Sequence, residues 1–243
     1  MIRRTAATAA TVATALAALS ALATVGACTS TDATPNTGDT TTQSPDPTTA
    51  PPSDEPIDLS EIPQGTSLEP GAYAVGLLDD DGPTLAIVDV PVGYFSSFGG
   101  TVVGSDAGDI AFWGKVTRVD SDPCFGGKRV AAGTSVDDLV SLLIAQRHMK
   151  ISQPVPVTIG GYHGVYLELT APADLDRCRG GIVTILSAGD GWLSSDVPSS
   201  TFDEWILNVE GQRVVGGARI DADAANRAEL IDMVESARFS VTG

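Results

Sequence analysis

Cysteine and histidine are the residue types of this chain best suited to nucleophilic, redox or metal chemistry, and both are scarce. The 243 residues include three cysteines and two histidines. Cys28 lies near the N-terminus, whereas Cys124 and Cys178 lie far along the chain. A thiol can accept a lipid, form a disulfide, attack a substrate or bind a metal. The residues around each cysteine therefore have to decide between these uses.

The N-terminal segment favours lipidation of Cys28. Arg3 and Arg4 precede an uncharged stretch rich in Ala, Thr, Leu and Val, which leads into Val25-Gly26-Ala27-Cys28. A basic start, an apolar core and a small-residue cleavage site predict a secretory signal peptide over residues 1–27. A cysteine directly after the small residues resembles the bacterial lipobox, whose thiol receives a diacylglyceryl group and becomes the mature N-terminus. A plain signal peptide with a chance cysteine and an uncleaved membrane anchor are the alternatives.

Lipidation of Cys28 would leave Cys124 and Cys178 as an even pair in an oxidising compartment. We therefore predict a disulfide between them. It would close a loop of about 55 residues and contribute about 4 kcal/mol in the chain-entropy model. Two buried free thiols and metal ligation are the alternatives. Neither His148 nor His163 lies at zinc-ligand spacing from a cysteine, so we expect no metal and no cofactor.

The other polar residues form no recognisable catalytic constellation. The chain contains no G-x-S-x-G, S-x-x-K, H-E-x-x-H or P-loop motif. His148 is interpreted as the basic end of a helix, and His163 as an exposed residue of a hairpin loop. Asp203 and Glu204 are interpreted as the solvated start of a strand. No catalytic residue is predicted, although the carboxylates leave a cell-wall-acting enzyme open as an alternative.

A small basic island surrounds the third cysteine. Arg177 and Arg179 flank Cys178 in an otherwise acidic chain. The two side chains could bind an anion, or they could pair with neighbouring aspartates. The second interpretation is favoured at this stage because Asp174 and Asp176 lie close by in sequence.

The net charge excludes several kinds of partner. Without residues 1–27 the chain keeps 12 basic and 31 acidic residues, a net charge of −19. Nucleic-acid binding is driven by Lys and Arg on phosphates, so no nucleic-acid partner is expected. Adhesion to an anionic bilayer is disfavoured for the same reason. Contact with the membrane is therefore expected through the lipid on Cys28, since a diacylated cysteine anchors a protein stably.

Two composition regimes divide the mature chain. Residues 29–56 hold nine Thr, six Pro, three Ser and five acidic residues, with no Lys, Arg or aromatic residue. Such a segment cannot bury enough apolar area to offset its ordering entropy. Residues 28–56 are therefore expected to be a lipidated N-terminus and disordered linker. Residues 57–243 are long enough for one domain with its own core.

Periodicity and turn residues place the elements of that domain. The clearest hairpin is predicted over residues 205–209 and 213–220, with its tip at 210–212. A helix is predicted from Ser135 to about 146–148, and another from Asp221 or Asp223 to about Ala237. Glycine doublets such as Gly216-Gly217 are interpreted as turns and bulges. The remaining strands are expected at 72–76, 84–90, 101–104, 110–118, 156–160, 164–170 and 181–188. This order predicts an α+β domain with a curved, mainly antiparallel sheet and two principal helices.

Several segments carry a family resemblance. Val90-Pro91-Val92-Gly93-Tyr94-Phe95 resembles the V-P-x-G-aromatic step of PsbP-like domains. Ile110–Trp113, Asp122–Cys124, Val157–Tyr162 and Trp205–Gly211 are similar to an uncharacterised actinobacterial family of secreted or lipidated proteins with a PsbP-like (LpqN-type) domain. The resemblance covers roughly residues 68–240. It implies a PsbP-like sandwich and supplies no catalytic motif, and fold alone does not fix activity.

These observations favour a cell-envelope lipoprotein on the extracytoplasmic face of the cell membrane. The soluble domain is expected to be a non-enzymatic binding or interaction module, with an envelope protein or a small apolar ligand as its partner. Alternatives are a carrier that holds a small apolar ligand or lipid between sheet and helix, and a cell-wall-acting enzyme. A pocket that gathers polar groups around an apolar lining would identify a binding site.

Overall fold

The computed structural model describes residues 55–78, 84–189 and 191–241. The predicted signal peptide, Cys28 and almost all of the predicted linker lie outside these residues, as does the predicted turn at 79–83. The described residues belong to one compact unit, Pro51–Gly243. Within them, no helix is long and apolar enough to cross a membrane.

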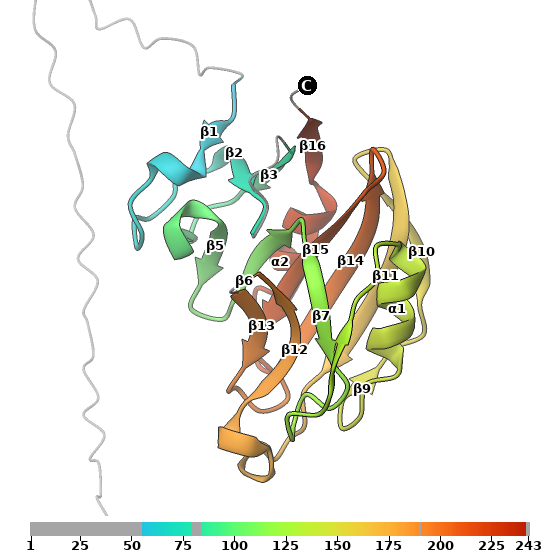
Figure 1. Cartoon of the computed structure of the whole chain (residues 1–243). Helices are drawn as coiled ribbons and strands as arrows, with labels where there is room; N and C mark the ends of the chain where they lie inside the picture. The colour runs from blue at the N-terminus through green and yellow to red at the C-terminus, as the bar shows by residue number, and fades with distance from the viewer. Residues whose placement is uncertain (1–54, 79–83, 190, 242–243) are drawn as a thin grey trace, which may run out of the picture. The chain divides into compact units, whose positions relative to one another are not determined.

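A large antiparallel sheet forms the centre of the domain (Figure 1). Its strand order is β10-β11-β14-β15-β6-β5-β4, and β9 pairs with β11 at one end. The strands are β4 (Phe95–Ser97), β5 (Val102–Ser105), β6 (Gly108–Trp113), β9 (Lys150–Ile151), β10 (Val155–Ile159), β11 (Tyr162–Thr170), β14 (Thr201–Val209) and β15 (Gln212–Ile220).

Two smaller sheets and two helices accompany the central sheet in the described residues. One sheet has the order β1-β2-β3-β16, with β1 (Ile57–Asp58), β2 (Gly71–Gly76), β3 (Thr84–Val90) and β16 (Arg238–Val241). The other has the order β13-β12-β7-β8, with β7 (Val116–Asp120), β8 (Arg129–Ala131), β12 (Val183–Ala188) and β13 (Gly191–Ser195). The helices are α1 (Val136–Ile144) and α2 (Arg227–Glu235), and short 3-10 turns are η1 (Leu59–Glu61), η2 (Phe98–Gly100), η3 (Leu175–Arg177) and η4 (Arg179–Gly181). This mostly β structure with two helices is consistent with the predicted α+β class.

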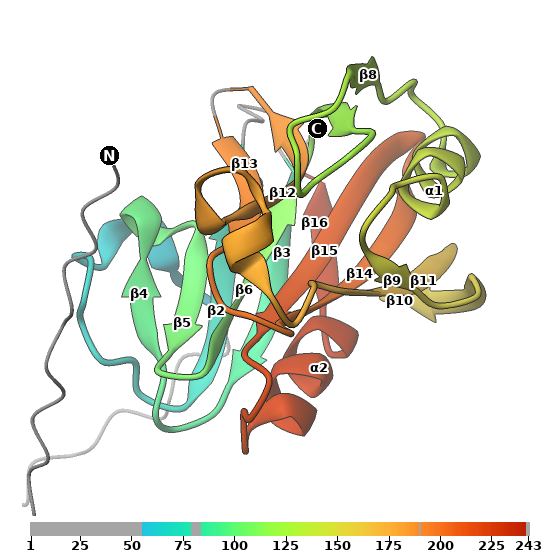
Figure 2. The ribbon, with the colours of Figure 1, turned by 90° about the horizontal axis from the view of Figure 1, so that it is seen from below.

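Both faces of the central sheet are covered, because its strands carry apolar residues on alternate sides. On β14, Trp205 and Leu207 join a core with α2 and the β1-β2-β3-β16 sheet. Phe202 and Ile206 join a second core with α1 and the β13-β12-β7-β8 sheet. Figure 2 shows β12 and β13 in front of the central strands and α2 below them in the view. A strand that lies between two cores carries apolar side chains on both faces. Its sequence therefore does not alternate between apolar and polar residues as that of a half-exposed strand does.

The β14–β15 hairpin is present as predicted and is longer at its open end. Its two-residue tip is Glu210-Gly211, with φ of 50° and 86°. Two positive φ angles in succession match the turns that suit the right-handed twist of paired strands. The Asn208 side chain accepts a hydrogen bond from the Gly211 N–H at 2.9 Å.

Several predicted boundaries were wrong. The single strand predicted over 110–118 is two strands, β6 and β7, which belong to different sheets. Helix α1 begins as predicted, with a reciprocal capping box between Ser135 and Asp138, but it ends at Ile144. Helix α2 begins only at Arg227 with Asn226 as its N-cap residue, and Asp221 pairs with Arg219. The extent of each helix was therefore overestimated at one end.

Gly216 and Gly217 are also not turn residues, because they lie in the middle of β15. A Cβ on Gly216 would stand 2.9 Å from the Phe112 ring, and one on Gly217 would stand 2.7 Å from the Trp113 ring. Both distances are closer than side-chain packing allows, so the missing Cβ atoms make room for these two aromatic side chains on opposite faces of the sheet.

Candidate functional site

The best candidate site is a cleft of about 450 Å³ between the central sheet and β13. We call it the aromatic cleft. Its apolar lining includes the side chains of Phe98, Val102, Ala111, Trp113 and Trp192, and its polar lining includes Asp109, Ser194 and Arg219. A mainly apolar concavity of this size with a few convergent polar groups is the usual form of a small-molecule site.

Alternate side chains of β6 point into the cleft. Asp109, Ala111 and Trp113 lie two residues apart and line the cleft, whereas Ile110 and Phe112 belong to the core on the opposite face. This is the two-residue period of an extended strand. The pairing of β6 with β15 brings Arg219 directly opposite Asp109 in the register.

The charged groups in the cleft neutralise one another. Arg219 donates through Nε to Asp109 Oδ2 at 2.8 Å and through Nη1 to Asp221 Oδ1 at 2.8 Å. Burial raises the pKa of Asp109, and the Arg219 guanidinium opposes that rise. Burial disfavours the charged form of Arg219. The carboxylates of Asp109 and Asp221 favour it, and their effect is larger, so the pKa of Arg219 is raised. The guanidinium is thus already engaged on two sides before any ligand arrives.

Two exposed aromatic side chains stand at the cleft. Phe98 is 71% exposed and Trp192 is 63% exposed. Phe98 also has φ of 45°, a left-handed conformation that is strained for a bulky residue. Backbone strain concentrates at binding and catalytic sites, where the surrounding structure maintains it. The exposure of large rings and the strain at Phe98 both point to this cleft as a functional surface.

The predicted cysteine pair is present. Cys124 and Cys178 form a disulfide, and both are buried in the core that contains α1. The disulfide lies away from the aromatic cleft and connects the loop after β7 to η4. Cys28, the predicted lipidation site, lies outside the described residues.

Each of the two histidines contacts a polar side chain from another part of the chain. His148 is not at a helix end, since α1 stops at Ile144 and His148 Nδ1 lies 3.0 Å from Asp122 Oδ1. Although burial opposes ionisation, contacts with His148 and the Phe125 N–H lower the pKa of Asp122. His163 is exposed as predicted, but its placement in a hairpin loop was wrong, because it lies in β11 and its Nδ1 is 2.9 Å from Thr158 Oγ1 on β10. Neither histidine lines the aromatic cleft.

The interpretation of Asp203 and Glu204 as a solvated strand start was wrong. Both residues lie within β14 and are fully buried, on opposite faces of the central sheet. Asp203 Oδ1 accepts hydrogen bonds from Tyr166 Oη at 2.5 Å and from Arg227 Nη2 at 3.1 Å. Burial raises the pKa of Asp203, and the hydrogen bond from Tyr166 and the Arg227 charge oppose the rise. Because Arg227 also contacts Glu168 at 2.8 Å, this cluster ties the start of α2 to the sheet.

Glu204 has a different environment. Neither of its carboxyl oxygens has a hydrogen-bond partner among the described residues. Burial, and secondarily the charge of Asp203, raises the pKa of Glu204 well above its ordinary value. Its carboxyl group lies over Gly217, as does the Trp113 ring. The Glu204 carboxyl group is therefore buried without a hydrogen-bond partner among the described residues, beside the Trp113 ring that lines the aromatic cleft.

The described residues contain no group of three or more His, Cys, Asp or Glu side chains arranged to hold a metal ion. The chain matches no protein-family model and no curated protein sequence. The PsbP-like resemblance therefore stays a prediction.

Sequence reasoning missed the aromatic cleft and its Asp109–Arg219 pair. The spacing of Asp109, Ala111 and Trp113 was a usable signal, because it places one carboxylate and one indole on the same face of a strand. The rest of the lining comes from Leu78, η2, β5, β13 and β15, most of which are distant in sequence. Their convergence depends on sheet order, which no local pattern encodes.

Proposed function

We propose that this protein is a lipid-anchored, non-enzymatic binding protein of the bacterial cell envelope, and that the aromatic cleft takes a small apolar ligand. The observation that carries the proposal is the presence of exposed Phe98 and Trp192 at a mostly apolar cleft of about 450 Å³. Exposed apolar side chains that gather at one concave surface often mark a ligand-binding groove. Covering these rings with an apolar ligand gains about 25 cal/mol per Å² removed from water.

The polar groups of the cleft fit orientation of a ligand better than reaction with it. Arg219 and Asp109 hold each other, so they present a fixed dipole instead of a mobile charge. Ser194 adds a hydroxyl on the β13 side. An apolar lining with a few fixed polar groups gives affinity from the first and orientation from the second.

A hydrolase is the second candidate, and Asp109 favours it. A carboxyl group with a raised pKa in a cleft has the property required of a general acid. A glycosidase needs a second carboxylate across the substrate, yet Asp221, the other acid here, contacts the same guanidinium as Asp109. This arrangement fits a structural ion triad better than an acid and base pair.

Binding is tested with the mature chain, residues 28–243, carrying Cys28→Ser so that no lipid competes for the cleft. Titration with the neutral apolar dye Nile red should give saturable fluorescence enhancement. Trp192→Ala should weaken dye binding about tenfold, since an indole contact is worth up to about 3 kcal/mol. Phe125→Ala is the matched control, because Phe125 is an exposed ring outside the cleft. Dye binding that is absent, or insensitive to Trp192→Ala, would reject the cleft as the site.

Membrane anchoring is tested separately in cells. Replacement of Cys28 by Ala should release the protein into the medium or leave an unprocessed precursor, and it should abolish labelling by radioactive palmitate. A processed Cys28→Ala protein that stays in the membrane fraction would reject the lipid anchor.

A further inference from the structure

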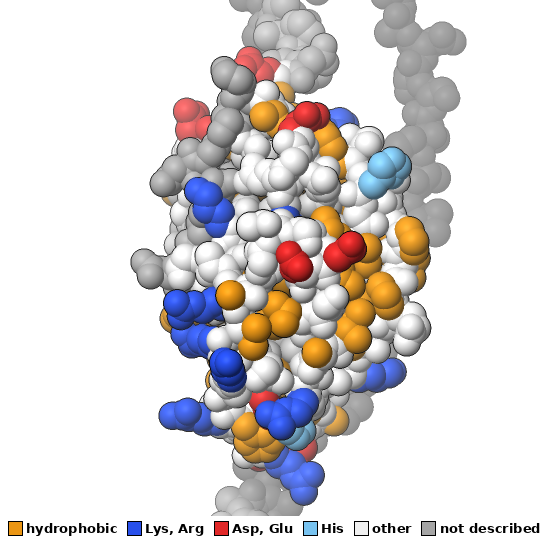
Figure 3. Space-filling view, turned by 45° about the vertical axis from the view of Figure 1, so that its right-hand side comes forward, with side chains coloured by type: hydrophobic (Ala, Val, Ile, Leu, Met, Phe, Trp, Pro, Cys, Tyr) orange, Lys and Arg blue, Asp and Glu red, His pale blue; other side chains and the backbone are white. Residues whose placement is uncertain are grey.

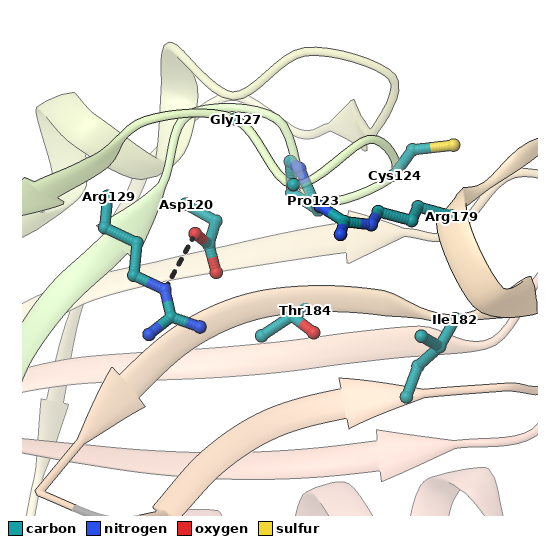
Figure 4. Close-up of a pocket in the computed structure, with 9 residues that line it drawn as sticks. Asp120, Pro123, Cys124, Gly127, Arg129, Arg179, Ile182 and Thr184 are labelled. Carbon is teal, nitrogen blue, oxygen red and sulfur yellow. Dashed lines mark ion pairs between the residues drawn. The ribbon is translucent and has the colours of Figure 1, made fainter.

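A second pocket, chemically unlike the aromatic cleft, lies beside the disulfide. It encloses about 400 Å³ between the loop after β7 and the start of β12. Its side-chain lining includes Asp120, Arg129, Arg179 and Thr184, and we call it the basic pocket (Figure 4). The figure shows Arg129 and Arg179 extending from different segments, with Thr184 on the β12 strand below them.

Covalent and backbone contacts hold the two walls of the basic pocket together. The disulfide joins Cys124 on one wall to Cys178, the residue before Arg179. The Arg179 N–H donates to the Cys124 carbonyl at 2.7 Å, and the Thr184 N–H donates to the Pro123 carbonyl at 3.1 Å. Arg179 is thereby positioned beside the loop after β7, although it lies more than fifty residues further along the chain.

The guanidinium groups of the basic pocket are not neutralised as Arg219 is. The Arg179 side chain has no hydrogen-bond or ion-pair partner among the described residues, contrary to the favoured expectation that it pairs with an aspartate. Arg177 does pair, with Asp174 at 3.4 Å. Arg129 approaches Asp120 Oδ1 only through Nε, at 3.5 Å, so both of its terminal nitrogens keep their donors.

The other polar groups near the basic pocket are already engaged. Asp122 faces away from it, toward His148 and Arg147. The N–H groups of Gly126 and Gly127 both donate to the Asp122 carbonyl. With one carboxylate against two guanidinium groups, the pocket carries a net charge of +1 in a chain of net charge −17. Both arginines and Thr184 line the pocket, so their side chains are the donors that it offers to an anion.

We propose that the basic pocket binds a phosphate group. Two guanidinium groups on separate segments offer more donors than the two oxygens of a carboxylate can accept, whereas a phosphate ester presents three or four oxygens. The pocket is large enough to admit part of the esterified group as well as the phosphate.

The domain surface also carries gathered basic side chains. Lys and Arg side chains lie toward the lower end of the face in Figure 3. In Figure 1, β1 lies near the top of the domain, whereas the orange turn that precedes β12 lies at the bottom. The phosphate can belong to a soluble ester or to a lipid headgroup, and the experiment separates these sources.

The test uses the mature chain with Cys28→Ser in phosphate-free buffer of low ionic strength. Calorimetric titration with inorganic phosphate and with glycerol 3-phosphate should show one saturable site. Arg129→Gln and Arg179→Gln should each weaken binding at least tenfold. Arg177→Gln is the matched control, because Arg177 lies two residues from Arg179 but does not line the pocket. Thermal melting verifies that all variants are folded.

A flotation assay with phosphatidylglycerol and phosphatidylcholine vesicles forms the second arm. Binding of glycerol 3-phosphate without flotation would assign a soluble ester, and flotation with phosphatidylglycerol that depends on Arg129 and Arg179 would assign a headgroup. The proposal is overturned if neither the phosphates nor the vesicles bind, or if Arg177→Gln weakens binding as much as Arg179→Gln. Equal losses would indicate diffuse electrostatic attraction in place of a site. This test does not depend on the aromatic cleft, so the two proposals stand or fall separately.

Discussion

The aromatic cleft and the basic pocket both contain arginine and aspartate side chains, but the two types are paired in opposite proportions. The cleft's one guanidinium, Arg219, contacts two carboxylates, Asp109 in the lining and Asp221 outside it. In the pocket, two guanidinium groups share one carboxylate, and Arg179 has no partner among the described residues. The cleft can therefore gain most from apolar contact, and the pocket from an incoming anion.

The two regions also differ in what holds them in shape. The cleft is formed by η2, β5, β6, β13 and β15, and the positions of its strands follow from hydrogen bonding within sheets and from packing. The pocket takes Asp120, Arg129 and Thr184 from β7, β8 and β12, and the Cys124–Cys178 disulfide joins the loop after β7 to the residue before Arg179. In the cleft, the charge of Arg219 is neutralised by carboxylates of the protein. In the pocket, the disulfide positions Arg179 without supplying a partner for its charge. Changes to the link and to the sheet should separate the two sites.

Removal of the disulfide has the largest expected effect. The double variant Cys124→Ser, Cys178→Ser should lose about 4 kcal/mol of unfolding free energy, because the reduced chain regains loop entropy. Urea denaturation measures this loss. At temperatures where the variant is still folded, phosphate binding should disappear and Nile red binding should persist. Unchanged phosphate affinity in the folded variant would show that the disulfide does not shape the pocket.

Gly217→Ala acts on the other site. Its Cβ would collide with Trp113 and Glu204, so we expect a loss of about 1–3 kcal/mol in unfolding free energy and weaker Nile red binding. Phosphate affinity should not change. Gly71→Ala is the matched strand control, since its Cβ would meet only the Tyr73 ring, at 3.9 Å. Equal destabilisation by the two variants would show that crowding at Trp113 is not the cause.

Glu204→Gln should change the pH dependence of stability. Because burial raises the pKa of Glu204, the unfolded chain releases its proton at a lower pH than the folded chain does. Stability from this group is complete below the unfolded pKa of about 4.3 and falls, by up to about 1.4 kcal/mol per pH unit, as the pH rises toward the folded value. Glu204→Gln should flatten the decline that urea denaturation measures as the pH rises above about 5. A decline of unchanged slope would contradict a raised pKa of Glu204.

The smallest expected effect comes from breaking the exposed ion pair between Arg177 and Asp174. Arg177 and Asp174 are both largely exposed and 3.4 Å apart. Such pairs contribute about 0–1 kcal/mol, so Arg177→Gln should leave the urea midpoint nearly unchanged. A large shift would show that the turn at η3 depends on this pair more than its exposure indicates.

Local sequence patterns predicted features that depend on neighbouring residues. The β14–β15 hairpin follows from alternation on either side of a glycine-containing tip, and the start of α1 follows from Ser135 as a capping residue. The pairing of Cys124 with Cys178 followed from counting cysteines under an assumed secretory signal, without any geometry.

Features that depend on sheet order could not be predicted. Asp203 and Glu204 resemble a solvated strand start until both faces of β14 are known to be covered. The break between β6 and β7 is similarly invisible, because the residues on both sides of it are buried. The aromatic cleft joins residues from 78 to 219, and only the assembled sheets bring them together.

The central claim is that this domain carries two separate sites with opposite ligand preferences. A crossed titration tests it most directly: Nile red and glycerol 3-phosphate are each titrated into Trp192→Ala, Arg179→Gln and the parent mature chain. The account predicts that Trp192→Ala weakens only dye binding, about tenfold, and that Arg179→Gln weakens only phosphate binding, at least tenfold. Loss of both ligands in either variant, or of neither ligand in both variants, would contradict it.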